Sequence, residues 1–360
     1  MNILGTGSIF SQGQGVAALE WALRNGWQKP SEIDIPRSDG KKRPVYQVDL
    51  DAVSDRTLLK KLRRADKLSK MSVLAAADAL ADSGIADITR KKIGIILATA
   101  FGAQVTTFEF LDGILDYGDT AVSPTTFSNS VHNAAASYVS SSLNIQGPTL
   151  TVTQFRFSFQ SALQLAQTWL QQGRCDYMLV GAVDQYGDVL GYVSEQKLTT
   201  AHDGRIRPFT FNPTCQVPGE GALFFLLGND RNENEYCSIN SVSTGDDPDS
   251  GKTVDINIID ADGMLPDESA YLSSLSPEIP TAAYAPVFGS MMIGGAFNLA
   301  AAALMLKQQM YYASPVLDNP HGLLLLNETR PAQIGLIRSI GCNCFGEKST
   351  VYLNRLNHIL

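Results

Sequence analysis

The chain has 360 residues, of which 44% are hydrophobic and 18% charged, and its formal net charge is −8. This composition is that of an ordinary globular protein with a sizeable core, and it excludes a disordered chain. The negative net charge offers no electrostatic basis for binding nucleic acid or an anionic membrane.

Strands and helices alternate along the chain, which predicts an α/β fold. Residues 2–4 predict a first strand that ends in a glycine turn at Gly5 and Gly7. The Ala- and Leu-rich stretch 70–84 predicts a helix that ends at Gly84. Continuous apolar runs are typical of strands buried on both faces, and they occur at 92–100, 177–185 and 221–228.

Residues 150–163 predict a strand that turns sharply into a helix. The stretch opens with the strand-forming Leu150 and Val152, and from Ser158 apolar residues recur at helical spacing until Gly173. Such an elbow often holds a nucleophile, because the turn exposes one side chain beside a helix N-terminus. This elbow carries Arg156 instead, with no Ser or Cys at its tip.

A polar segment at about 229–250 separates the chain into two predicted parts, residues 1–240 and residues 241–360. The second part again predicts α/β structure. A strand is expected near 254–259, a helix near 292–308 and a final pair of strands near 334–354.

A basic cluster follows the first fifty residues and has the spacing of a helix. Its members are Lys60, Lys61, Arg63, Arg64, Lys67 and Lys70, interspersed with Leu62 and Leu68. The cluster is either a solvated helix face or a docking patch for an acidic partner.

Tests for cofactor and metal motifs are negative. The Gly5-Thr6-Gly7 turn does not continue into a dinucleotide-binding pattern, and no phosphate-binding P-loop is present. The histidines at 132, 202, 321 and 358 are scattered, and Cys342 and Cys344 are expected to be buried structural residues. No cofactor and no metal are expected.

The chain is expected to lie in the cytoplasm. Its five cysteines are an odd number in a long chain, which disfavours a secreted disulfide framework. The first ten residues lack the basic and apolar regions of a signal peptide, and no apolar run reaches the length of a membrane span.

The order of these segments resembles the β-ketoacyl synthase family. The resemblance runs through 63–84, 123–152 and 176–184, and is closest at 203–227, where the Arg-Pro-Phe motif at 207–209 and the Gly-Glu-Gly-Ala motif at 219–222 match the family's signatures. It implies an α/β, thiolase-like fold of five layers, αβαβα, with two similar halves.

The resemblance also implies a mechanism whose catalytic groups are absent here. A ketosynthase uses an elbow cysteine as acyl acceptor and two histidines for decarboxylation and oxyanion stabilisation. The alignment puts Arg156 at the cysteine, Asp262 at the first histidine and Gly295 at the second. It puts Ser290 at the family's lysine and Glu347 at its gating phenylalanine, so no catalytic residue is expected.

The replacements form a physically consistent set. A buried arginine needs space and a counter-charge. Gly295 would supply the space, and Asp262 and Glu347 would supply carboxylates, so Arg156 is predicted to form a bidentate, largely buried ion pair with one or both. The alternative is that Arg156 is a surface residue of the elbow without a partner.

The family's acyl tunnel runs along a subunit interface, which implies a set of interface residues in this chain. Candidates for lining a partner's tunnel are Phe110, Ile114, Phe127, His132 and Asn133. Phe108, Leu111 and Leu115 have helical spacing and are alternatively core residues.

The resemblance favours a catalytically silent homologue similar to the chain-length factors of type II polyketide systems, most like those of bacterial aryl-polyene clusters. Its partner would be an active ketosynthase, in a heterodimer or higher heteromer. An acyl carrier protein would act through that partner or on the basic cluster. Two alternatives remain: an active acyltransferase or decarboxylase with His132 as base, and a homodimeric acyl-binding scaffold.

Overall fold

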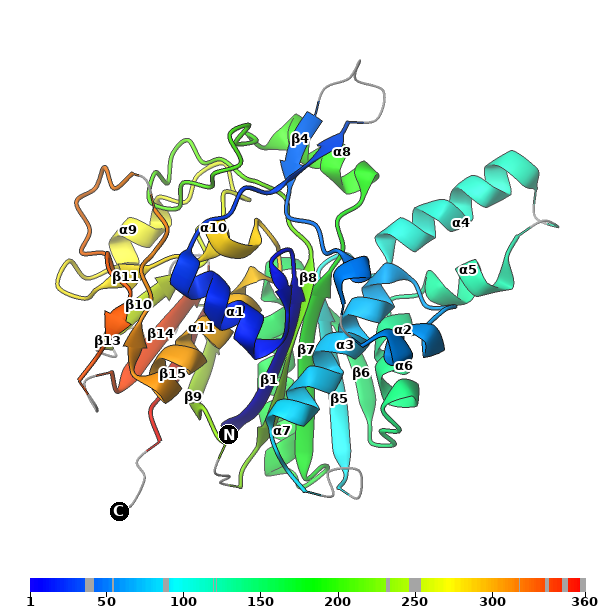
Figure 1. The fold of residues 1–360 in the computed structure, drawn as a ribbon, viewed down its shortest axis with the longest axis horizontal. Coiled ribbons are helices and arrows are strands. Elements are labelled where there is room, and N and C mark those ends of the chain that lie inside the picture. The colour runs from blue at the N-terminus through cyan, green and yellow to red at the C-terminus, as the bar shows by residue number, and fades with distance from the viewer. Residues whose placement is uncertain are drawn as a thin grey trace.

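The structure is a computed structural model that describes residues 1–35, 42–53, 55–86, 91–118, 120, 122–230, 234–245, 254–316, 318–333, 337–344 and 349–356. In these ranges eleven strands form one mixed sheet (Figure 1). Ten of them follow the order β11 (Thr281–Ala282), β10 (Ile256–Ile259), β14 (Ser339–Cys344), β15 (Ser349–Asn354), β9 (Cys237–Thr244), β1 (Asn2–Phe10), β8 (Gly221–Gly228), β7 (Tyr177–Asp184), β5 (Ile93–Thr99) and β6 (Thr149–Thr153). The short β2 (Gly13–Gln14) pairs with β1.

Apart from the short β2, the sheet consists of two five-stranded parts that meet where β9 pairs with β1. This junction is short, because only Ser238 and Cys237 of β9 pair with Asn2 and Ile3 of β1. Along most of its length β9 pairs with β15 instead. A division of the chain at residue 240 stays a prediction.

Helices cover the sheet and bury its apolar side chains. α3 (Lys67–Asp82) packs on β1 and β8, with α6 (Ala134–Ser142) beside it. On the other side, α7 (Ser158–Gln171) packs on β5 and β7 and also reaches β9. α11 (Gly294–Gln308), which is almost fully buried, packs against β14, and α1 (Gly15–Asn25) lies against β1. The helices thereby enclose two hydrophobic clusters, one with α1, α7 and α11 and the other with α3 and α6.

Several further helical elements connect the strands. They are α2 (Arg56–Lys61), α4 (Gln104–Tyr117), α5 (Pro124–Asn129), the 3-10 turn η4 (Phe155–Phe157), α8 (Asp188–Lys197), α9 (Ala270–Ser274) and α10 (Ala285–Phe288). A hairpin of β3 (Ser31–Asp34) and β4 (Lys42–Val45) lies beside α8, and a second pair joins β12 (Met310–Tyr311) to β13 (Arg330–Pro331). Figure 1 shows α4 and α5 projecting away from the rest of the chain.

The predicted glycine turn after residue 4 is wrong. β1 runs straight through Gly5 and Gly7 to Phe10. A Cβ at Gly7 would lie 2.2 Å from the Ala75 carbonyl oxygen, and one at Gly5 would lie 2.4 Å from that of Ala79. The glycines therefore let α3 lie directly on the strand, which is a packing role and not a turn.

The other strands and helices expected from the sequence are confirmed, apart from a single basic helix at 60–70. Lys60 and Lys61 end α2, a turn follows, and α3 begins at Lys67. The break arises because the Asp66 side chain caps α3 by accepting a hydrogen bond from Ser69 N. Lys67 forms an ion pair with the buried Glu220 and is not a free surface charge.

Candidate functional site

The elbow at the end of β6 turns its arginine inward. η4 follows β6 and leads directly into α7. Phe155 has a positive φ of 47° and a side chain that is 64% exposed, whereas Arg156 is 5% exposed. The Ser158 hydroxyl holds this geometry by accepting a hydrogen bond from Gln154 N at 2.7 Å. The exposed tip is therefore a phenyl ring, and the guanidinium points into the protein.

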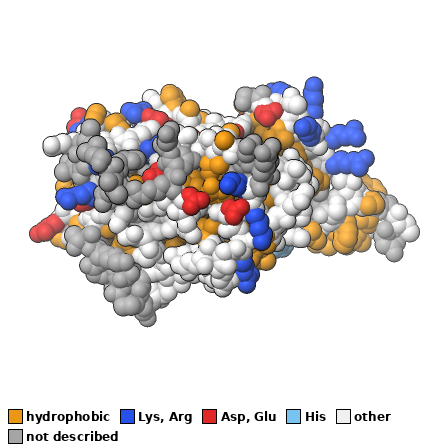
Figure 2. All heavy atoms as spheres, turned by 90° about the horizontal axis from the view of Figure 1, so that it is seen from below, with side chains coloured by type: hydrophobic (Ala, Val, Ile, Leu, Met, Phe, Trp, Pro, Cys, Tyr) orange, Lys and Arg blue, Asp and Glu red, His pale blue; other side chains and the backbone are white. Residues whose placement is uncertain are grey.

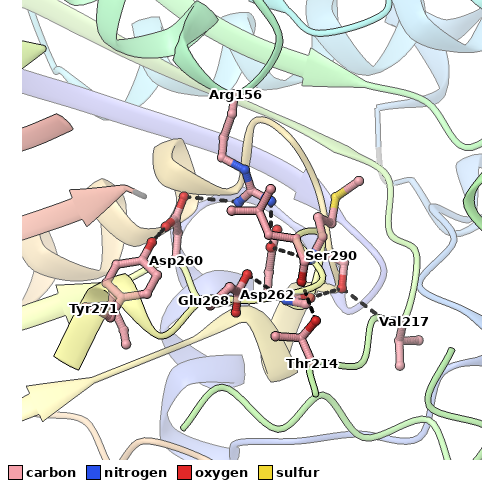
Figure 3. Close-up of polar contacts among 12 residues, drawn as sticks. Arg156, Thr214, Val217, Asp260, Asp262, Glu268, Tyr271 and Ser290 are labelled. Carbon is pink, nitrogen blue, oxygen red and sulfur yellow. Dashed lines mark hydrogen bonds and ion pairs between the residues drawn. The ribbon is translucent and has the colours of Figure 1, made fainter. Parts of the chain in front are cut away.

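Arg156 forms buried ion pairs with two carboxylates (Figure 3). Its Nη2 atom lies 2.9 Å from Asp262 Oδ1, and its Nη1 atom lies 3.4 Å from Asp260 Oδ2. The predicted pairing with Asp262 is confirmed, and the alternative of a solvent-facing Arg156 is wrong. Asp260 is a partner that the sequence analysis missed, and Glu347 lies outside the described residues. The guanidinium bridges two carboxylates, with each of its terminal nitrogens paired to a different one.

Further groups hold these two carboxylates in place. The Tyr271 hydroxyl donates a hydrogen bond to Asp260 Oδ1, and Met264 N donates one to Asp262 Oδ1 at 3.1 Å. A third carboxyl group, Glu268, is also buried and accepts a hydrogen bond from Gly263 N at 3.2 Å. The loop that follows β10 thus surrounds one guanidinium with three carboxyl groups.

The charges in this cluster shift one another's protonation. Burial by itself lowers the pKa of Arg156, but the charges of Asp262 and Asp260 outweigh it, so that pKa lies well above the usual arginine value. Burial raises the pKa of Asp262 despite the guanidinium, with Asp260 adding to the rise. Burial, then the charge of Asp262, raises the pKa of Glu268 well above its usual value. One cation is therefore shared among three buried carboxyl groups, and burial favours the neutral form of Asp262 and Glu268.

Ser290 holds the backbone of this cluster by hydrogen bonds, whereas Gly295 lies next to α7. The Ser290 hydroxyl donates a hydrogen bond to the Asp262 carbonyl at 2.5 Å and accepts one from Val217 N at 3.0 Å. Ser290 thereby fixes the loop that carries Asp262. Gly295 lies in the first turn of α11, where a Cβ would lie 3.2 Å from Gln160 Nε2. The space at Gly295 is therefore next to Gln160 of α7, one turn after Arg156.

The predicted interface residues are only partly brought together. The rings of Phe110 on α4 and Phe127 on α5 lie 5.4 Å apart, and Ile114 is half-buried nearby on α4. His132 and Asn133 are exposed, and the His132 ring packs on Gly102, where a Cβ would lie 2.8 Å from it. The sequence analysis assigned Leu111 and Leu115 as core alternatives, but both are exposed. A tunnel lined by these residues stays a prediction.

Most of the cysteines are buried, and the three described histidines are exposed. Cys175, Cys237, Cys342 and Cys344 are buried, as expected for Cys342 and Cys344, and burial raises the pKa of each thiol. His202 and His321 are exposed, and His358 lies outside the described residues. The described residues hold no group of three metal-ligating side chains, and none of their helices is long and apolar enough to cross a membrane.

A pocket lies next to the cluster, beneath α8, and contains a buried carboxyl group that the sequence analysis did not single out. Asp184 ends β7 and accepts hydrogen bonds from Thr99 Oγ1 and Ala100 N, both at 2.9 Å. Burial raises the pKa of Asp184 to about 6 despite these hydrogen bonds. The sequence signal was an acidic residue at the end of a continuous apolar run, where burial is able to shift a carboxyl pKa.

This carboxyl group predicts a pH-dependent stability. Between about pH 4 and pH 6 the folded protein holds a proton that the unfolded chain has released. The free energy of unfolding should therefore fall as the pH rises through this window, by about 3 kcal/mol in total for Asp184. Asp184→Asn should remove that part of the slope. Urea unfolding of both proteins from pH 4 to pH 7 measures the difference, and parallel curves would contradict the prediction.

The comparisons with known proteins agree with this architecture. Structures that match 99% of this chain and 99% of their own length include a β-ketoacyl synthase from Burkholderia phymatum STM815 (TM-score 0.78, 18% identity) and the ishigamide ketosynthase/chain length factor (TM-score 0.77, 16% identity). A type II PKS acyl-carrier protein in complex with its ketosynthase, AntDE:AntF, matches over the same shares at a TM-score of 0.76 and 16% identity. The fold is therefore thiolase-like, as expected.

The sequence comparisons define the family. The model for "Beta-ketoacyl synthase, N-terminal domain" matches residues 1–232. Nodulation protein E of Rhizobium leguminosarum bv. trifolii is 26% identical over 231 residues, which are 62% of this chain and 57% of that protein. Three of the first curated relatives are matched over 42% to 57% of their own length, about half. The chain belongs to the β-ketoacyl synthase family.

Proposed function

We propose that this chain is a catalytically silent ketosynthase homologue that acts as a chain-length factor. It pairs with an active ketosynthase and shapes the acyl tunnel of that partner during chain elongation in fatty-acid or polyketide synthesis of the aryl-polyene type. The observation that carries this proposal is the inward-facing Arg156, ion-paired with Asp260 and Asp262 at an elbow without a cysteine.

The chemistry of the cluster argues against acyl transfer at this elbow. A guanidinium is protonated at every physiological pH and cannot act as a nucleophile. The exposed side chain at the tip is Phe155, which is also unreactive. Carboxylates beside the elbow would repel the thiolate and the enolate on which ketosynthase chemistry depends. The contribution of the chain would then be shape and surface and not bond chemistry.

An exposed apolar surface supports a protein partner. Its members are Leu111, Leu115 and Tyr117 of α4, Phe127 of α5, Val131, and Leu150 of the edge strand β6. Large exposed apolar patches mark interaction sites, and an edge strand offers free backbone groups for pairing. Figure 2 shows a hydrophobic patch together with a group of Lys and Arg side chains at the end of the molecule where α4 and α5 project. An acidic carrier protein would find complementary charge there, at the exposed Lys60, Lys61, Arg63 and Arg64.

Co-expression with a ketosynthase that has an intact Cys-His-His set tests the proposal. A tag on this chain should recover both proteins in equal amounts, and the complex should elongate acyl chains from malonyl carrier protein. A ketosynthase that makes the same products alone, or that never co-purifies, would refute the proposal. Labelling of the isolated chain by an acyl or malonyl thioester would support the rearranged enzyme instead. Tight acyl binding by a homodimer would support the scaffold.

The apolar surface makes a specific prediction for this complex. Leu115→Glu and Phe127→Glu should each reduce recovery of the ketosynthase at least tenfold, since each places a charge in a dry interface. The melting temperature should stay unchanged for Leu115→Glu, because Leu115 is 81% exposed, and should fall only slightly for Phe127→Glu, because Phe127 is 56% exposed and loses its contact with the Phe110 ring. Trp21→Glu is the matched control, because Trp21 is similarly exposed at 51% but lies on α1. Equal recovery of all three variants would remove α4 and α5 from the interface.

A further inference from the structure

A second pocket lies at the C-terminal end of α1 and shares no residue with the Arg156 cluster or with the pocket beneath α8. The end of that helix and the turn after it form one wall, and residues 313–316, Thr329 and Arg205 form the others. The volume of the pocket is about 370 Å³, which is within the range of small-molecule sites. It is therefore large enough for an organic ligand and not only for water.

The charged side chains that line this pocket are both cations. They are Arg24 of α1 and Arg205, and none of the described lining residues carries a carboxyl group. The chain as a whole has 36 acidic residues against 28 Lys and Arg, so the lining is opposite in charge to the average of the chain. Arg24 is compensated by Glu20, whose Oε1 accepts a hydrogen bond from Arg24 Nε at 2.8 Å. The two arginines therefore differ in what they offer to a ligand.

The guanidinium of Arg205 has no counter-charge among the described residues. Asp203 accepts a hydrogen bond from the backbone N of Arg205 at 3.0 Å, but its carboxylate forms an ion pair with Arg207 at 2.5 Å. The next carboxylate, Asp318, also pairs with Arg207, at 3.5 Å. The pocket thus contains one uncompensated positive charge, which attracts a ligand with one negative charge.

Trp27 fixes the orientation of this guanidinium. The Cζ atom of Arg205 lies 3.7 Å from the centroid of the Trp27 ring, and at this separation the guanidinium lies flat on the indole. Its N–H groups then point along the plane of the stack, where they stay free to donate. The indole is itself held, because Trp27 Nε1 donates a hydrogen bond to the Gly204 carbonyl at 2.9 Å. A planar fork of N–H donors in a fixed position matches the two oxygens of a carboxylate.

The apolar walls of the pocket indicate that the ligand is more than a bare anion. Leu23, Trp27, Ala313, Pro315 and Val316 form these walls. A small inorganic anion would leave them in contact with water, whereas an apolar body would remove that surface from water and gain free energy.

We propose that the pocket at the end of α1 binds a small organic acid with one carboxylate and an apolar body. The carboxylate accepts hydrogen bonds from the guanidinium edge of Arg205, and the body lies against Trp27 and Val316. This inference does not depend on the role proposed for the chain, because no residue of the Arg156 cluster or of the apolar surface on α4 and α5 lines this pocket.

Three probes separate the charge of the ligand from its apolar body. They are 4-phenylbutyrate, which has both, 4-phenylbutyramide, which has the same shape without the charge, and inorganic phosphate, which is an anion without an apolar body. Calorimetric titration of the full chain at pH 7.5 measures their affinities. The carboxylate should bind at least tenfold more tightly than the amide and than phosphate. No binding of 4-phenylbutyrate, equal affinity for the amide, or tighter binding of phosphate would each overturn the proposal.

Two variants test the place of binding. Arg205→Gln removes the uncompensated charge and should weaken 4-phenylbutyrate at least tenfold. Val316→Trp fills the pocket without changing any charge and should abolish binding. The matched control is Arg330→Gln, because Arg330 also lies over an aromatic ring, 4.8 Å from the centroid of Tyr311, but does not line the pocket. Its affinity should equal that of the unmodified chain. Unchanged affinity in Arg205→Gln or in Val316→Trp, or an equal loss in Arg330→Gln, would overturn the proposal.

Discussion

Replacing Arg156 by methionine is expected to lower the free energy of unfolding by about 3–5 kcal/mol, which is what breaking a buried ion pair from one side typically costs. Methionine fills much of the same volume, so the loss comes chiefly from charge and not from a cavity. Without the guanidinium, Asp260 and Asp262 face each other and Glu268 in a site where all three are buried. Urea unfolding at pH 7.5 measures the effect.

A variant that also removes the negative charges is the matched control. Arg156→Met combined with Asp260→Asn and Asp262→Asn keeps the shapes but leaves no uncompensated ion, so most of the lost stability should return. Acidification should likewise rescue Arg156→Met alone, because its carboxyl groups then take up protons in the folded state. Equal destabilisation of the single and triple variants would show that the arginine acts by packing.

The sequence predicted only part of the candidate site, namely that Arg156 needs a carboxylate and that Asp262 is one. A buried arginine at the elbow requires a carboxylate as counter-charge, and the resemblance to the family placed Asp262 near it. Asp260 is only two residues away, but its role depends on how the loop after β10 folds. That loop turns at Gly263, where φ is 78° and a Cβ would lie 2.1 Å from the Cys215 carbonyl oxygen. A contact with residue 215 leaves no periodic signal in the sequence.

The fold shows the same limit. Continuous apolar runs identified β5, β7 and β8, because a strand buried on both faces is apolar at nearly every position and needs no information from its neighbours. Gly5 and Gly7 were misread, since a glycine in a turn and a glycine under a close helix look alike in sequence. What separates them is α3, more than sixty residues away. Local pattern therefore predicts the elements, and the site depends on the contacts between them.

A cysteine placed at the elbow by Arg156→Cys is expected to remain unreactive. The two carboxylates that stabilise a guanidinium would raise the pKa of a thiol at the same position. Cys344 shows the effect in this cluster: burial, then the charge of Asp260, raises the pKa of its thiol well above the usual value. Arg156→Cys should thus hold almost no thiolate at pH 8 and react with iodoacetamide about 100-fold more slowly than an ordinary thiol.

The matched comparison separates charge from access. Arg156→Cys with Asp260→Asn and Asp262→Asn has the same backbone and the same path for the reagent, but no carboxylates beside the sulfur. Both variants also carry Cys215→Ser, and mass spectrometry measures the rate of alkylation at residue 156. This rate should be much higher in the variant without carboxylates than in Arg156→Cys. Cys215 is removed because it is the one cysteine of the five that is not buried. Equal rates would mean that access limits the reaction. The expected difference means that recovering the nucleophile requires changing its whole surroundings, since the charges around Arg156 oppose a thiolate as strongly as they favour the guanidinium.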